Sequence, residues 1–381
     1  MNKKLLESVI RRFNVTGDVL DITPLTSGHI NTTYCVKMPC ERQYTLQVIN
    51  KYVFKDPVAV MDNILRVTAH IKNVLARDGG DVERESLSVV LANNGLPYYL
   101  DDDGNYWRLY VFISGAHTQN FVSEPHALYN AGFGFGKFQR MLSDFPIETL
   151  HETIPQFHDT RMRYEQLMAA VERDELGRVY ESRDEIEFFV SRKHELSKLV
   201  ELTDSGEMPI RVTHNDTKFN NILIDDVSND ALSVIDLDTV MPGLLVNDFG
   251  DAIRYAASTA VEDETDLSKV EVDLSAYKSF SDGFLTALHG MLTPIEFSYL
   301  PLGAKIITME LSMRFLTDHL TGDKYFKIHK PGHNLARARC QRKLAQSMED
   351  NFDTMVSLIS KYAPCSNYAE NADNIPCASA I

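Results

Sequence analysis

Hydrophobic and polar residues alternate in short runs through the first third of the chain. Between residues 19 and 112 these runs are separated by turn residues, which is typical of β-strands. A helical repeat replaces them in one segment, residues 56–78. The expected strands cover residues 19–25, 32–38, 44–49, 87–91 and 106–112.

The pattern changes after Ile113-Ser114-Gly115, where apolar residues recur at helical spacing. A strand-rich island at residues 210–238 interrupts this second part. We therefore predict an α+β chain with a β-rich lobe over residues 1–113, a helical lobe over 114–363, and a mobile tail over 364–381. The expected helices cover residues 123–142, 159–175, 183–202, 273–289 and 294–320.

Charge limits the kinds of partner. The chain of 381 residues carries 54 acidic and 38 basic side chains, for a formal net charge of −16. Such a surface repels polyanions, so we expect no nucleic-acid partner. A phosphate group would have to be held locally by a divalent cation and backbone amides, and Mg²⁺ is the natural candidate.

The sequence lacks the features of a secreted, membrane-bound or zinc-binding protein. Residues 1–13 predict an amphipathic helix, not a signal peptide, and no later stretch is long and apolar enough to span a membrane. The five cysteines are scattered, without the spacing of a zinc site. We expect a cytoplasmic protein with no membrane partner. The sequence does not fix an oligomeric state.

The island holds an unusual set of polar residues. It reads Thr-His-Asn-Asp-Thr-Lys-Phe-Asn-Asn-Ile-Leu-Ile-Asp from Thr213, and Val-Ile-Asp-Leu-Asp from Val234. Asp216 and Asn221 share one loop, and a returning strand can bring Asp236 beside them. Phosphoryl transfer needs these groups, namely a carboxylate for the attacking hydroxyl, and an amide and a carboxylate for the metal. As separate residues, they would be ordinary turn formers and a strand-end cap.

The order His-x-Asp-x-x-x-x-Asn followed by Ile-Asp-x-Asp resembles the aminoglycoside phosphotransferase and choline kinase superfamily. The resemblance implies a bilobal protein-kinase-like fold that uses ATP. It also implies that Asp216 is the catalytic base, that Asn221 and Asp236 bind magnesium, and that His214 braces the loop. Asp238 is expected to support the metal site without contacting the ion.

The wider string, including Asn-Asp-Phe-Gly-Asp-Ala-Ile-Arg downstream, is similar to the N-acetylhexosamine 1-kinases. That resemblance implies transfer of the γ-phosphoryl group of ATP to the anomeric hydroxyl of a small sugar, N-acetylglucosamine or N-acetylgalactosamine. It implies that Asp216, Asp236 and Arg314 contact this substrate. By itself, Arg314 on an apolar helix face is the pattern of a salt bridge.

The nucleotide site is expected between the first two strands and along the hinge. The turn contains Ser27, Gly28, His29 and Asn31, with one glycine where protein kinases have three, and a plain hairpin is the alternative. The strand after next, at residues 44–49, carries Gln47 where kinases place a phosphate-binding lysine, and glutamine brings no charge. In residues 108–113 the hinge is expected to present Tyr110 and Phe112 to the adenine.

Two other motifs are interpreted as structural. Asp248-Phe249-Gly250 copies the magnesium triplet of protein kinases, but it lies too far from Asn221, so we expect Asp248 to cap a helix. The glycine-rich run from Gly132 to Lys137 lacks a preceding strand and a following Ser or Thr. It is expected to allow close helix packing.

Two alternatives to an N-acetylhexosamine kinase stay open. A kinase of the same fold could act on choline, homoserine or an aminoglycoside, although the expected helices show no acidic cluster to hold a cation. A binding protein that has lost catalysis is the other alternative, and Gln47 is its only support.

Overall fold

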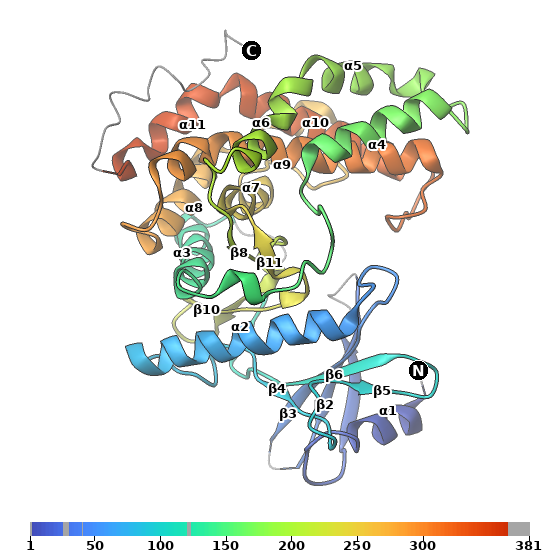
Figure 1. Ribbon diagram of the computed structural model, residues 1–381, viewed down its shortest axis with the longest axis vertical. Coiled ribbons are helices and arrows are strands. Elements are labelled where there is room, and N and C mark those ends of the chain that lie inside the picture. The colour runs from blue at the N-terminus through green and yellow to red at the C-terminus, as the bar shows by residue number, and fades with distance from the viewer. Residues whose placement is uncertain (1, 26–29, 40, 120–122, 365–381) are drawn as a thin grey trace.

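An antiparallel sheet of six strands forms the smaller lobe of the computed structural model (Figure 1). The structure describes residues 2–25, 30–39, 41–119 and 123–364. The strand order is β1-β2-β3-β6-β4, and β5 pairs with β6. Their bounds are β1 Asp21–Leu25, β2 Thr32–Lys37, β3 Gln43–Val48, β4 Val89–Val90, β5 Tyr99–Leu100 and β6 Tyr106–Val111.

Helices cover both faces of this sheet. Helix α1 (Lys3–Ile10) packs its apolar side on one face, together with Val36, Leu46 and Trp107. Helix α2 (Pro57–Asp78) is capped by Asp56, which accepts hydrogen bonds from the amides of residues 58 and 59, and it ends at a left-handed Gly79. Its buried residues contact both this sheet and the other lobe, so α2 lies between the lobes (Figure 1).

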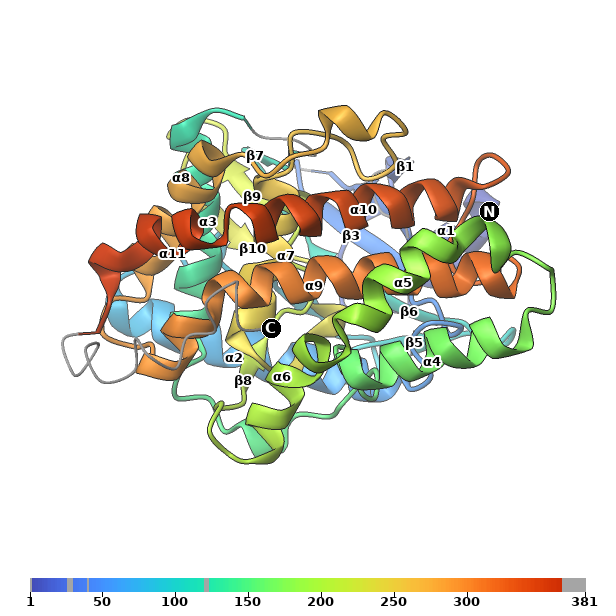
Figure 2. The same cartoon turned by 90° about the horizontal axis from the view of Figure 1, so that it is seen from above.

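The larger lobe is a helical bundle around α9, which packs against α4, α7 and α10 (Figure 2). Its long apolar helices share a single large core. The bounds are α3 Pro125–Met141, α4 Thr160–Arg173, α5 Arg183–Ser191, α6 Lys193–Asp204, α7 Leu245–Ala256, α8 Leu274–Ala287, α9 Pro294–Thr321, α10 His333–Asp350 and α11 Phe352–Ile359.

Two small sheets lie where the lobes meet. One pairs β8 (Arg211–Thr213) with β11 (Met241–Gly243). In the other, β9 (Ile222–Asp225) lies between β10 (Ala231–Val234) and β7 (Ala116–His117). Residues 214–221 and 235–240 run between these strands, so the island predicted from the sequence faces the smaller lobe.

The α+β prediction is confirmed, as are most of the expected elements. The single helix expected at residues 183–202 is wrong, because Arg192 leaves helical geometry and separates α5 from α6. Both helices face the same core, so the apolar repeat runs through the break. Within the described ranges, no helix has the length and apolar character needed to cross a bilayer.

The glycine-rich run lies inside α3, as expected. A Cβ atom on Gly132 would lie 2.1 Å from the carbonyl oxygen of Phe280, and one on Gly136 would lie 2.6 Å from that of Phe284. Both carbonyls belong to α8. The close approach of α3 and α8 therefore requires these glycines, which confirms their structural interpretation.

Candidate active site

The loop after β8 is held in place by a buried carboxylate. Asp248, in the first turn of α7, accepts hydrogen bonds of 2.7 Å from the amides of His214 and Asn215. Asn215 is left-handed (φ 63°), a conformation that asparagine tolerates better than most residues. Its side chain donates to the carbonyl of Thr239.

The prediction that Asp248 caps a helix is therefore wrong. Residue Leu244 occupies the N-cap position of α7, and no side chain makes a capping hydrogen bond there. The carboxylate instead reaches across to the loop before Asp216. Its role is structural, as predicted, but its partners belong to the candidate catalytic loop.

Asp216 lies between two polar neighbours. Its Oδ2 atom accepts from Lys218 Nζ at 2.7 Å and from Asn221 Nδ2 at 3.1 Å. Burial disfavours the charged carboxylate, but the ammonium group of Lys218, together with His214 and the hydrogen bond from Asn221, outweighs burial and lowers the pKa of Asp216. Asp216 is thus held ionised, as a proton acceptor must be.

His214 packs behind this loop. Its ring is fully buried against Phe135 and Phe138. The Nδ1 atom accepts from the amide of Asp216 at 3.3 Å, which leaves Nε2 to donate to the carbonyl of Ile235 at 2.9 Å. The imidazole therefore links the Asp216 loop to the residue that precedes Asp236.

Asp236 follows β10 in a left-handed conformation (φ 61°) at the start of the short helix η4 (Leu237–Thr239). Among the described residues its carboxylate accepts no hydrogen bond. Burial raises the pKa of Asp236 to about 6, and the nearby carboxylates of Asp238 and Asp216 add to this rise. A carboxylate so placed is stabilised by an added cation.

The available donor atoms suit a hard divalent cation. The amide nitrogen of Asn221 is used by Asp216, so its oxygen is left to accept or to coordinate. Together with the carboxylate of Asp236, this oxygen would give a metal ion two protein ligands. Mg²⁺ binds through one or two such protein ligands and completes its shell with water and phosphate oxygens.

A cavity of about 330 Å³ opens between the two lobes beside these residues. Gln47, Tyr110, Phe112, Asn221 and Asp236, all predicted site residues, lie in its wall. Strands of the smaller lobe supply one side, and the 218–236 segment supplies the other. The remaining described lining residues are Leu25, Ile30, Thr33, Thr45, Leu87, Arg108, Val111, Ile113, Ala116, His117, Thr118, Lys218, Asn220, Leu223 and Ile235.

Comparison with known proteins assigns the chain. Residues 21–279 match the family model described as "APH: Phosphotransferase enzyme family". The chain belongs to this phosphotransferase family. The match includes the whole island, and it confirms the phosphotransferase class that the island predicted.

Solved structures of kinases share the fold of this APH family member. An aminoglycoside phosphotransferase from Alicyclobacillus acidocaldarius has a TM-score of 0.59 at 11% identity, over 93% of this chain and 96% of that chain. Choline kinase from Cryptosporidium parvum has a TM-score of 0.59 at 14% identity, over 95% and 99%. An amicoumacin kinase gives 0.58 at 12% identity, over 91% and 94%. The kinase-like fold expected from the sequence is thereby confirmed.

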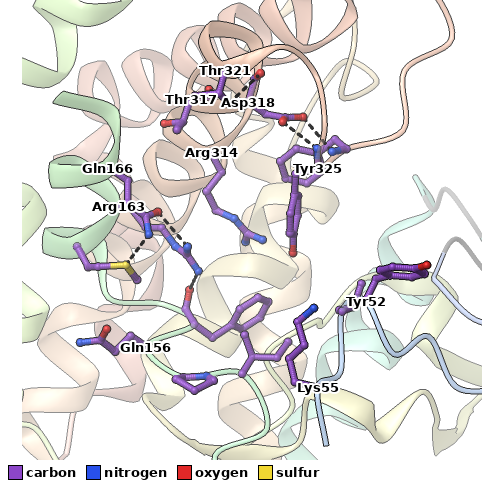
Figure 3. A pocket seen from close by; sticks show the side chains of 16 residues that line it. Tyr52, Lys55, Gln156, Arg163, Gln166, Arg314, Thr317, Asp318, Thr321 and Tyr325 are labelled. Atoms are coloured by element: carbon purple, nitrogen blue, oxygen red, sulfur yellow. Dashed lines mark hydrogen bonds between the residues drawn. The ribbon is translucent and has the colours of Figure 1, made fainter. Parts of the chain in front are cut away.

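The APH family member has a second cavity, of about 440 Å³, lined by α4, α9 and the segments at 52–55 and 154–157. Arg314 and Tyr325 point into it from the helical lobe, and Lys55 points toward them from the smaller lobe (Figure 3). Arg314 lies 3.5 Å from the buried Glu310 and over the ring of Phe157. Arg314 therefore forms the salt bridge that its position on an apolar face predicted, and it also lines a cavity. Its contact with a sugar stays a prediction.

The predicted residues near the nucleotide loop are only partly described. Ser27, Gly28 and His29 lie outside the described residues. Asn31 is described, and its side chain donates to Asp238 at 2.7 Å. Asp238 also binds Arg108 of β6, and both side chains of that ion pair are at most 3% exposed.

Sequence reasoning missed three contributors to this site. Lys218 stands two residues after Asp216, a spacing that could have suggested their ion pair. Arg108 and Asp248 carried no comparable signal, because their partners are distant in sequence. Each becomes visible only when β6 or α7 is placed beside the island.

Proposed function

We propose that this APH family member is an ATP- and Mg²⁺-dependent kinase for the anomeric hydroxyl of an N-acetylhexosamine. The observation that carries the kinase chemistry is the grouping of Asp216, Asn221 and Asp236 at one side of the interlobe cavity. Three kinase relatives of the same fold support a small-molecule acceptor.

The mechanism follows from the contacts of Asp216. Its ionised carboxylate accepts a hydrogen bond from the acceptor hydroxyl and orients the oxygen for in-line attack on the γ-phosphorus. As the new O–P bond forms and the bond to ADP breaks, the hydroxyl proton passes to Asp216. Asn221 and Asp236 would hold a Mg²⁺ ion, which would supply positive charge to the phosphate oxygens. Lys218 fixes the carboxylate of Asp216 during the transfer.

Charge in the second cavity supports an uncharged acceptor over a cationic one. Lys55, Arg163 and Arg314 line it. Asp318 is the one carboxylate among its described lining residues, and its oxygens already accept from the amides of residues 324–326 and from Asn334. Choline or an aminoglycoside would find no free anion there, whereas a sugar can use the donors and the aromatic walls.

The position of this cavity supports its use as the acceptor site. Thr153, directly before its wall at Ile154, donates to the carbonyl of Asp238. On the other side, Asn50 lies two residues before Tyr52 of the cavity wall. The amide of Asn50 donates to Asn31, and Asn31 donates to Asp238. Both walls therefore adjoin the turn that carries Asp236.

A coupled ADP-release assay with Mg-ATP tests the acceptor. Turnover is expected with N-acetylglucosamine or N-acetylgalactosamine, and the product should lack a reducing end and give a sugar 1-phosphate signal in phosphorus NMR. Arg314→Ala should raise the KM for the sugar and leave the KM for ATP unchanged. Turnover of choline, homoserine or an aminoglycoside in place of both sugars would refute the acceptor but not the kinase chemistry.

A further inference from the structure

Position 47 lacks a charge, but a charged residue lies directly opposite. Gln47 of β3 and Arg108 of β6 are paired across the antiparallel ladder. Side chains at facing positions of such strands lie on the same side of the sheet, close enough to bond. Gln47 Oε1 accepts from Arg108 Nε at 2.8 Å, and Gln47 Nε2 donates to Thr33 at 3.0 Å. Gln47 therefore holds the arginine.

The guanidinium of Arg108 is buried but still reaches the cavity. Its residue is 1% exposed, and it lines the cavity together with Asp236 and Lys218. Nε binds Gln47, and Nη1 binds Asp238. Nη2 donates to no described residue, so this edge of the guanidinium group can still donate hydrogen bonds. A buried arginine is expected to use that capacity.

The anion that anchors Arg108 comes from the other lobe. The α2 residue beside Arg108 is Met61, whose sulfur lies 3.9 Å from Nη1. Among the described residues, no carboxylate of α2 contacts Arg108. The carboxylate that pairs with Arg108 is that of Asp238 in η4. Because Asp238 follows Asp236 by two residues, the cation is fixed relative to the candidate metal ligand.

We propose that Arg108 supplies the positive charge toward the nucleotide phosphates that Gln47 cannot supply. Its Nη2 edge donates to phosphate oxygens, while Gln47 and Asp238 set its orientation. Charge-assisted hydrogen bonds of this kind are the natural use of a planar guanidinium beside phosphate. The inference rests on the proposed function in that a nucleotide must occupy this cavity. It does not depend on which acceptor is used.

The test compares ligands that differ in their phosphates. The Arg108→Gln/Asp238→Asn variant removes both charges, so neither is left buried without its partner. Calorimetric titration with adenosine and with Mg-ADP should give an unchanged adenosine affinity and an ADP affinity at least tenfold weaker than that of the original chain.

A rescue variant and a matched control complete the design. In Gln47→Lys/Arg108→Gln the cation moves to β3 and can still pair with Asp238, so most of the ADP affinity should return. Glu195→Gln/Lys305→Gln removes another buried ion pair, between α6 and α9 and away from the cavity lining. It should change neither affinity. Thermal melting verifies that each variant is folded.

The ratio of adenosine affinity to ADP affinity decides the outcome. If the double variant keeps the ratio of the original chain, Arg108 has a structural role alone and the proposal is overturned. If the rescue variant folds but does not recover ADP binding, the proposed cation function is also overturned. If the original chain binds no nucleotide, the proposed kinase function is refuted as well. If it binds nucleotide but does not turn over either sugar, the acceptor is refuted and the proposed role of Arg108 stands.

Discussion

Removing the carboxylate of Asp248 should disturb catalysis through the backbone of the catalytic loop. Asp248 is 2% exposed and accepts from two buried amides, those of His214 and Asn215. The buried side-chain amide of Gln139 donates to the same carboxylate. Replacement of Asp248 by alanine leaves all three donors without a partner. Each unpaired buried donor costs about 1–3 kcal/mol, so Asp248→Ala should lower the free energy of unfolding by about 3–9 kcal/mol.

Asp248→Ala should also lower the turnover rate. Asn215 is held at φ 63°, and a non-glycine residue in that region stores about 1–3 kcal/mol of strain. Without Asp248, the loop can relax and shift Asp216, which is the next residue. A shift of about 1 Å at a reacting group can lower the rate by about 10²-fold. Urea denaturation and steady-state kcat measure the two effects.

Asp273 provides a matched control, because it is an actual helix cap. Its carboxylate accepts from the amides of Ser275 and Ala276 at the start of α8. Asp273→Ala should cost about 1 kcal/mol and leave kcat unchanged. If Asp248→Ala behaves like Asp273→Ala in both assays, the argument that Asp248 positions the catalytic loop is refuted.

Three further predictions concern the site and the core. Asp216→Asn should lower kcat by at least ~10²-fold with Mg-ATP affinity retained in calorimetry, and near-normal turnover would exclude Asp216 as the base. Because the pKa of Asp236 is raised to about 6, protons should compete with the metal below that pH. Mg-ADP affinity should therefore fall as pH drops from 7 to 5. Asp236→Asn should bind Mg-ADP weakly at every pH in this range. An Mg-ADP affinity of the original chain that does not change with pH would contradict this. Gly132→Ala should cost about 1–3 kcal/mol in urea denaturation, since its Cβ would lie 2.1 Å from the carbonyl oxygen of Phe280, and a more stable variant would contradict that contact.

The central site could be predicted because its parts are close in sequence. Asp216 and Asn221 share one loop, and the hairpin of β9 and β10 returns the chain to Asp236. Turn residues and strand lengths determine such local geometry. Helix α2 was equally clear, because a capping aspartate and a C-terminal glycine bound its apolar repeat.

The supports of the site could not be predicted in the same way. Asp248 reaches the loop only because α7 packs beside β8, and its sequence context suggested a helix cap. Asp238 was expected near the metal, but its partner Arg108 lies 130 positions earlier in the chain. Such pairs depend on strand register and on how the lobes meet, neither of which is visible in the local pattern.

The ion pair between Arg108 and Asp238 also bears on the hypothesis of a protein that has lost catalysis. Gln47 was the sole sequence feature in its favour, because a missing lysine would leave the phosphates without a cation. In the fold, Gln47 faces an arginine at the paired position and accepts a hydrogen bond from it. A buried guanidinium needs partners of this kind, so Gln47 at this position suits a site that keeps its cation on the neighbouring strand. The absence of a lysine at position 47 is therefore not evidence against catalysis.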